Sequence, residues 1–441
     1  AMVDIDLSPK GREVFSKELT RQRLSVYDGT VTLRGDGVVV RVVSSQSTDV
    51  FGIEIEDTRT NPEPITARLR MLRPPEVYEK HHSVVSNCEF SDTHIALKQV
   101  FREDEFYCSS AVAIAASGGA IATKFSDETG GREVMRSSAK IRGIGQSMET
   151  EIAFSIEPGA RKRFVYVGSA ASFDPETSTA SRAHDVATAA AHAGFEHLVS
   201  EALVWWRDFW SGSHVHLESA DGDAAVVESH YNYFLYLMAC CSRGRYAPRY
   251  GCMLFSTHGD KRAWGAQQWW TNLSLYYRGL LPTGKYELLD GFYNHYLGVK
   301  ESCALAARQQ WGSDGIYFPE TIWFDGLAPL PDDIAEEMRD LYLCRKPWGK
   351  RRAKFDEYAS IRHPHSSRWN WIGHGKWVDG KWSYGYNAVP PFSPVNHFFA
   401  SGAEIAFLFW KQYEYSRDQE WLRDTAYPIL RGVAEVLCSF P

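Results

Sequence analysis

The 441-residue sequence lacks several features that would assign it to a functional class at once. No run of eighteen apolar residues occurs, so no membrane-spanning helix is predicted. The N-terminal stretch has no apolar signal-peptide core, and Ala1-Met2 resembles a cloning remnant, so we expect the natural N-terminus to be absent. No long Lys/Arg run is present and the formal net charge is −7. Binding to nucleic acid or to an anionic membrane is therefore not expected.

Metal-binding and disulfide signatures are also missing. The eight cysteines form no CxxC pair, which favours buried thiols over a disulfide framework or a zinc site. His81-His82 is adjacent on an expected strand, where neighbouring side chains point to opposite faces and converge poorly on a metal. We predict no metal and no cofactor. Cysteine usage leaves the compartment open, and we favour a secreted or periplasmic location over a cytoplasmic one.

Tryptophan is absent from the first 204 residues, whereas all fifteen tryptophans lie at or beyond Trp205. A chain of this length exceeds one ordinary hydrophobic core. The shift in composition predicts two domains of different construction: a β-sandwich over 1–170 and a helical domain over 222–441, joined by a helical linker over 171–221.

Short segments rich in β-branched residues dominate the first half, and turn signals such as Gly35-Asp36-Gly37 separate them. The segments with this pattern are 38–45, 50–57, 65–72, 94–101, 109–116, 149–157 and 163–170. Many short strands punctuated in this way predict an antiparallel sandwich.

Longer apolar periodicities follow. Helices are predicted over 225–243, 264–280, 285–309, 395–415 and 419–440, the last carrying Pro428 after an early break. A single strand is predicted over 214–219. Short turns alternate with the long loops 244–263 and 310–394, which is typical of helical hairpins with functional loops on one side.

The segment 262–277 is unusually rich in tryptophan, tyrosine and amides. On a continuous helix, Gln268, Thr271, Asn272 and Tyr276 would share one uncharged face. Amides match sugar hydroxyls because they both donate and accept, and aromatic rings offer flat surfaces to pyranose faces. Carbohydrate binding is one interpretation; a buried helix whose polar groups satisfy one another is the other.

Two carboxylates are candidates for acid–base chemistry. Glu320 follows Pro319 among aromatic residues, where burial would raise its pKa as a general acid requires. A loop glutamate can equally bind a sugar hydroxyl or cap a helix. Glu404 follows His397 and Ser401 on one polar stripe of an apolar helix, where structural pairing is the alternative to a place in the cleft.

The loop 362–382 mixes histidines, basic residues and tryptophans. Such interleaving occurs in proteins that bind single-stranded nucleic acid, but the acidity of the chain argues against that here. No Cys or Glu completes a metal pattern with the histidines. A sugar-binding rim that includes Trp371 is the preferred interpretation.

The order of motifs in the second half resembles the six-hairpin glycosidases, and glycoside hydrolase family 95, the α-L-fucosidase type, is the most similar family. The matching motifs are the Pro282-x-Gly284 turn, the W-G-x-x-G loop from Trp311, the Y-x-x-x-R-D run from Tyr413 and A-Y-P-I-L from Ala426. Of the family's asparagine-rich active-site run only Asn272 is matched, and the loop around Thr321 and Trp323 carries changed polar groups. The resemblance covers about 195–441.

This resemblance implies an (α/α)6 barrel of twelve helices, of which the sequence supplies five or six. We therefore expect a helical-hairpin toroid that is incomplete in this chain, completed by a second chain or a missing segment. The family's general acid and base would then lie beyond Pro441. A set of substrate-binding residues is predicted from the two aromatic segments and the polar stripe: Trp264, Gln267, Gln268, Trp269, Asn272, Trp311, Thr321, Trp323, Trp371 and His397.

The implied activity is hydrolysis of a glycosidic bond in an oligo- or polysaccharide, exo-acting and inverting, with Glu320 and Glu404 as the catalytic candidates within the chain. Two alternatives remain open: a carbohydrate-binding protein that kept the barrel without catalysis, and a glycoside phosphorylase. No Gly-rich phosphate signature supports the phosphorylase. The sugar, the linkage and the anomer are not predicted.

Overall fold

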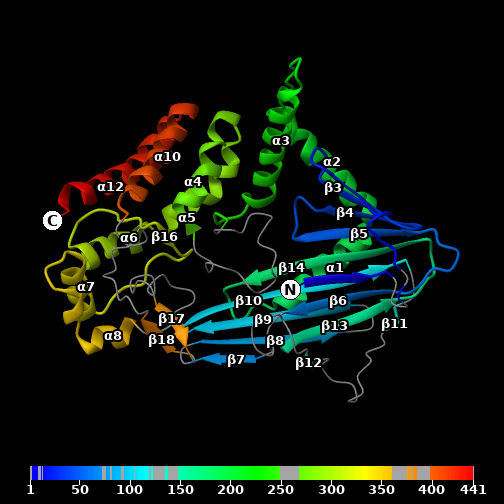
Figure 1. Cartoon of the computed structure of the whole chain (residues 1–441), viewed down its shortest axis with the longest axis horizontal. Coiled ribbons are helices and arrows are strands. Elements are labelled where there is room, and N and C mark those ends of the chain that lie inside the picture. The colour runs from blue at the N-terminus through cyan, green and yellow to red at the C-terminus, as the bar shows by residue number, and fades with distance from the viewer. Residues whose placement is uncertain are drawn as a thin grey trace. The chain divides into compact units, whose positions relative to one another are not determined.

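The computed structural model describes most of the chain in separate ranges, with short gaps in the first half and longer ones around residues 123–147, 249–267, 360–374 and 385–397. The described residues are 2–7, 11, 13–71, 76–79, 82–90, 94–103, 105–118, 121–122, 135–137, 148–248, 268–359, 375–378, 381–384 and 398–440. Two compact units divide at His214 and Val215 (Figure 1).

The first unit contains two antiparallel sheets. The nine-stranded sheet has the order β2-β3-β4-β5-β14-β10-β9-β8-β7, and the smaller one has the order β1-β6-β13-β11, with β12 also paired to β13. The bounds of the large sheet are β2 Arg21–Ser25, β3 Thr30–Arg34, β4 Val38–Ser44, β5 Val50–Asp57, β7 Glu76–Glu79, β8 His82–Phe90, β9 His94–Glu103, β10 Phe106–Ser117 and β14 Lys162–Ser172. Those of the small sheet are β1 Met2–Asp6, β6 Ile65–Met71, β11 Ile121–Ala122, β12 Met135–Ser137 and β13 Met148–Ile156.

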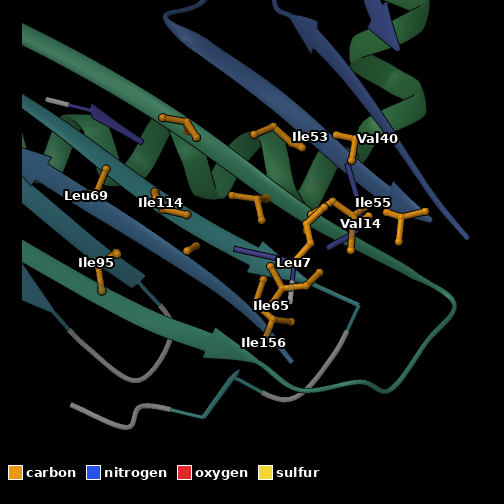
Figure 2. Packing of buried hydrophobic residues seen from close by; sticks show 14 of the residues in the cluster. Leu7, Val14, Val40, Ile53, Ile55, Ile65, Leu69, Ile95, Ile114 and Ile156 are labelled. Carbon is orange, nitrogen blue, oxygen red and sulfur yellow. The ribbon is translucent and has the colours of Figure 1, made fainter. Parts of the chain in front are cut away.

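The hydrophobic core of this unit is formed by side chains from both sheets. Ile65 and Ile156 from the small sheet belong to one buried cluster with Ile55, Ile114 and Val165 from the large sheet (Figure 2). Two sheets that share one core form a sandwich. The predicted antiparallel β-sandwich is confirmed, because the alternating pattern of each strand places its β-branched residues on the shared face.

Two helices complete the first unit, α1 (Thr179–Ala193) and α2 (Phe195–Ser211). Alanines on α1 pack against alanines of β9 and β10. This approach is close: a Cβ at Gly168 would lie 2.3 Å from the carbonyl oxygen of Ala183. Small residues on both sides therefore determine how closely the helix lies on the sheet.

The second unit is mainly helical, which confirms the predicted change from a β-rich to a helical domain. Its helices are α3 Asp223–Cys241, α4 Trp270–Arg278, α5 Asp290–Gly298, α6 Lys300–Ala306, α7 Asp332–Tyr342, α8 Ala353–Ala359, α10 Ala400–Ser416, α11 Gln419–Trp421 and α12 Tyr427–Ser439. Short 3-10 turns occupy Leu281–Thr283, Tyr286–Leu289 and Trp348–Lys350, and π-helical turns occupy Ala307–Trp311 and Leu422–Ala426. Two small hairpins are formed by β15 (Gln268–Trp269) with β16 (Thr321–Ile322) and by β17 (Gly375–Val378) with β18 (Lys381–Tyr384). None of the helices in the described ranges is long and apolar enough to cross a membrane.

Three predicted elements differ from the structure. The helix predicted over 264–280 begins only at Trp270, because residues 268–269 pair as β15 with β16. The segment 214–219 is not a strand; Glu228 of α3 instead accepts a hydrogen bond from the Leu217 amide at 2.8 Å. The predicted loop 310–394 contains α7, whose spaced apolar residues Ile334, Met338 and Leu341 are buried.

Two of the predicted helices are interrupted in the structure, one of them as expected. The helix predicted over 285–309 is broken at Val299, beside the poor helix former Gly298. The early break predicted in 419–440 is present: α11 ends at Trp421, a π-helical turn spans Leu422–Ala426, and Pro428 lies in the first turn of α12, where proline is tolerated.

Candidate functional site

Both candidate carboxylates accept hydrogen bonds from residues of α4. Strand β15 leads directly into α4, and β16 follows Glu320, so the β15–β16 pairing places Glu320 beside the first turn of the helix. The backbone amide of Trp270 donates to the carbonyl oxygen of Glu320 at 2.9 Å. The position of Glu320 is therefore determined by a strand pairing between distant segments of the chain. Glu320 and its hydrogen-bond donor Thr271 are 49 residues apart in the sequence.

The side chain of Glu320 is buried, with 5% of the residue exposed. Its Oε1 accepts a hydrogen bond from the backbone amide of Thr271 at 2.9 Å. This amide is one of those that a helix N-terminus leaves without a partner inside the helix, and an anion is favoured there. Oε2 is also buried, and it has no hydrogen-bond partner among the described residues.

Burial raises the pKa of the Glu320 carboxyl above its usual value. Hydrogen bonds from Thr271 oppose this rise, while the negative charge of Glu404 adds to it. Desolvation and a neighbouring carboxylate are two of the usual means by which proteins keep a carboxylic acid protonated.

Glu404 lies on α10 and is more accessible, with 41% of its side chain exposed. Its Oε2 accepts hydrogen bonds from the indole Nε1 of Trp270 at 2.7 Å and from Nη2 of Arg278 at 2.8 Å. Oε1 of Glu404 has no hydrogen-bond partner among the described residues, so each of the two carboxyl groups has one oxygen bound by the protein and one without such a bond.

The helix that carries Glu404 is attached to the segment that carries Glu320. Ser401 is fully buried, and its hydroxyl donates a hydrogen bond to the carbonyl oxygen of Phe318 at 2.9 Å. Together with the bond from Trp270 to Glu404, this links α4, α10 and the 318–320 segment into one local arrangement.

Aromatic rings surround the buried carboxyl group. Tyr296 of α5 lies edge-on to Phe318 at 5.2 Å and to Trp270 at 6.5 Å between ring centroids. Its hydroxyl is buried without a hydrogen bond to a described residue, and burial, followed by the charge of Glu320, raises its pKa well above 10.0. Tyr296 and Arg278 were not among the predicted site residues, since neither lies in a motif that shows its relation to Glu320 or Glu404.

The other predicted binding residues have different environments. Gln268 is buried and donates from Nε2 to the carbonyl oxygen of Ala247 at 3.1 Å, so it does not share a helical face with Asn272, which is exposed. Thr321, Trp311 and Trp323 are buried and Trp269 is partly buried. Four predicted residues lie outside the described residues: Trp264, Gln267, Trp371 and His397.

This arrangement offers one buried carboxyl group suited to hold a proton and one ion-paired carboxylate, both next to α4. Such a pair can support general acid–base chemistry. Among the described residues no group of three or more His, Cys, Asp or Glu side chains is placed to bind a metal ion.

No protein-family model matches the sequence. A comparison with curated proteins finds no match either. Among solved structures, the chain is similar to a candidate kojibiose phosphorylase from the human microbiome, with 13% identity, a TM-score of 0.44, and coverage of 98% of this chain and 59% of that one. It is also similar to a family GH92 α-mannosidase from Bacteroides thetaiotaomicron, with 10% identity, a TM-score of 0.34, and coverage of 92% and 50%. The chain thus spans between half and three fifths of the length of these proteins.

Proposed function

We propose that this chain contributes to a glycoside hydrolase that cleaves a glycosidic bond in an oligo- or polysaccharide. In this proposal Glu320 is the general acid and Glu404 is the partner carboxylate. From the sequence resemblance we infer a protein with an architecture like that of the α-L-fucosidases. We infer that its reaction is exo-acting and inverts the anomeric configuration.

The observation that carries the proposal is the asymmetry between the two carboxyl groups. Glu320 is buried and its pKa is raised, whereas Glu404 is partly exposed and paired with Arg278. Glycoside hydrolysis requires a carboxyl group that holds a proton beside one that is ionised. Neither Oε2 of Glu320 nor Oε1 of Glu404 accepts a hydrogen bond from a described residue, so neither oxygen is already bound within the protein.

The reaction would proceed as a displacement at the anomeric carbon. Glu320 gives its proton to the glycosidic oxygen as the carbon–oxygen bond breaks, and the leaving sugar departs as an alcohol. A water molecule attacks the anomeric carbon from the opposite face and loses its proton to Glu404. Atoms and charges balance without a cofactor.

The decisive variant is Glu320→Gln, assayed in the full-length protein against a panel of glycans. The amide oxygen still accepts from the Thr271 amide, so the local structure is retained, but the proton donor is lost. We expect release of monosaccharide to fall by about 10²- to 10⁴-fold, the usual contribution of a general acid. Glu414→Gln, on the same helix as Glu404, is the matched control and should retain activity.

Two results would contradict this assignment. One is full activity of Glu320→Gln, and the other is the absence of sugar release from every glycan tested. Parallel reactions with and without inorganic phosphate separate hydrolysis from phosphorolysis. The anomer that NMR detects first in the product distinguishes inversion from retention.

A second candidate is a carbohydrate-binding protein without catalytic activity. The hydrogen bond from the Thr271 amide to Oε1 of Glu320 favours it, because a carboxylate at a helix N-terminus can serve the helix alone. This candidate predicts sugar binding by calorimetry with no turnover, and binding that Glu320→Gln does not reduce.

A further inference from the structure

The second unit contains an open groove of about 420 Å³ whose lining residues are distinct from those around Glu320. It is lined by residues from α6, from the π-helical turn Ala307–Trp311, from the 315–316 segment and from α12. The side chains that characterise it are Lys300, Glu301, Arg308, Tyr427, Arg431 and Glu435. Nothing in the proposed hydrolysis uses these residues.

The floor of the groove is formed by close contact between two glycines. A Cβ on Gly315 would lie 2.2 Å from the carbonyl oxygen of Gly432, and a Cβ on Gly432 would lie 2.5 Å from Cδ1 of Ile316. The amide of Ile316 donates to the same Gly432 oxygen at 2.8 Å. Backbone therefore lies against backbone here, and the groove is a fixed feature of the packing rather than a gap between long side chains.

The charges around the groove are incompletely paired. Arg431 binds Glu435 at 2.8 Å, and Lys300 lies 3.8 Å from Glu301. Arg308 is exposed and has no ion pair with a residue that the structure describes. Three cationic side chains thus face two carboxylates, and one guanidinium is available to a ligand.

An aromatic ring lies at the same groove. Tyr427 is 58% exposed although it is a large aromatic side chain. An exposed ring next to charged groups offers the apolar face of a pyranose a flat surface, while the neighbouring polar groups bind its hydroxyls. A single exposed tyrosine would not indicate a binding site, but Tyr427 lines the same groove as the guanidinium of Arg308.

We propose that this groove binds an acidic saccharide, with the carboxylate of a uronic acid on Arg308 and a pyranose face on Tyr427. Arginine binds a carboxylate in a bidentate manner, which gives the contact both energy and direction. The carboxylates of Glu301 and Glu435 disfavour a multiply charged phosphate, but they accept hydrogen bonds from sugar hydroxyls. The mixture of charges therefore fits an acidic sugar better than a phosphate.

The test uses the intact protein with two defined probes, a tetragalacturonate and a hyaluronan tetrasaccharide, titrated by calorimetry. We expect at least one of them to bind, with affinity that falls as salt increases. Arg308→Gln should weaken that binding by roughly tenfold or more, because a charge-assisted hydrogen-bond pair is lost. Tyr427→Ala should weaken it as well, while a neutral maltotetraose should bind less tightly than the acidic probe.

Two controls make the result specific to the groove. Arg345→Gln removes the same charge at an exposed position of the same unit that does not line the groove, and it should leave binding unchanged. Glu320→Gln should also leave it unchanged, so failure of the hydrolase proposal and failure of this one are distinguishable. Circular dichroism and melting of each variant show whether it remains folded.

Three results would overturn the proposal. They are no binding of either acidic probe, binding that folded Arg308→Gln and Tyr427→Ala both retain, and competition by inorganic sulfate at concentrations equal to those of the saccharide. The last would show a simple anion site.

Discussion

Two buried carboxyl groups, Asp57 in the sandwich and Glu320 in the helical unit, have different environments. In the sandwich, Asp57 is buried and accepts hydrogen bonds from Arg59 and from Arg163, whose Nη2 lies 2.9 Å from Oδ2. In the helical unit, Oε2 of Glu320 and both ring nitrogens of His295 are buried without a hydrogen bond to a described residue. Buried polar groups are normally paired, so Oε2 of Glu320 requires another explanation.

The pKa values of these two carboxyl groups are shifted in opposite directions. Burial alone would raise the pKa of Asp57, but hydrogen bonds from Arg59 and the charge of Arg163 outweigh it, so its pKa is lowered. At Glu320 burial prevails and its pKa is raised. A paired network fixes structure, whereas a perturbed and partly unpaired carboxyl group is a candidate for function.

The largest expected effect is in the sandwich. Asp57→Asn removes the buried carboxylate that binds two buried guanidinium groups, which should lower the free energy of unfolding of this unit by about 3–5 kcal/mol. Hydrogen exchange of peptides from β5 and β14, followed by mass spectrometry, measures this unit separately. The exposed substitution Glu18→Gln should have no effect; equal protection in Asp57→Asn would show that the network does not stabilise the sandwich.

The next effect depends on pH and on His295. Burial lowers its pKa to about 4 from the usual 6.5. Between these values the unfolded chain binds more protons than the folded one, so stability is full above pH 6.5 and is lost as pH falls toward 4, by up to about 3 kcal/mol. Urea unfolding of the intact protein at pH 5 and pH 7, followed by hydrogen exchange in peptides from α5, measures the difference. His295→Phe should reduce it, and an unchanged difference would assign the pH dependence to other groups.

A smaller effect is expected from Trp270→Phe. The variant loses the indole hydrogen bond to Glu404, and a bond to a charged group contributes about 1.5–3 kcal/mol, part of which water replaces at this partly exposed carboxylate. We expect a modest loss of stability and a fall in kcat with little change in KM. Trp410→Phe, on α10, is the control; equal kinetics for both variants would remove Trp270 from the site.

Glu320→Gln should change stability least, by less than about 1 kcal/mol, in contrast to Asp57→Asn. Because the pKa of Glu320 is higher in the folded than in the unfolded protein, this carboxyl group destabilises the folded state as pH rises above the unfolded pKa. The amide of Gln does not ionise, so the variant lacks this pH-dependent loss of stability. The stability of the variant relative to the native protein should therefore increase between pH 4.5 and pH 7. A clear decrease over this range would indicate that Glu320 mainly caps α4.

The β half could be read from the sequence because its signals are local. Segments such as 50–57 alternate in pattern and end at turn residues, and the observed β5 has the same bounds. Helix α3 was likewise recognisable from its length and composition. By contrast α7 was missed within a segment taken for a loop, although Ile334, Met338 and Leu341 have helical spacing.

The candidate site was only partly accessible to such reasoning. The aromatic context of Glu320 and the polar stripe of Glu404 made both carboxylates candidates, and their roles stay predictions; Trp270 and Arg278, which bind Glu404, did not stand out. Trp270 and Arg278 are separated from Glu404 by 134 and 126 positions, and no local pattern relates groups so far apart. Helical periodicity predicted that Gln268 lies in a helix, which is wrong. In the structure Gln268 pairs with Ile322 as part of β15, and this long-range pairing overrides the local helical pattern.

The sequence by itself determined a β-sandwich followed by helices, since alternation and helical periodicity act over a few residues and the burial of apolar side chains requires them. Only the tertiary structure decided that Glu320 is buried against the first turn of α4 while Glu404 remains partly exposed and paired with Arg278. The pKa of a carboxyl group depends on its solvation and on nearby charges in space, and the order of residues along the chain does not specify either.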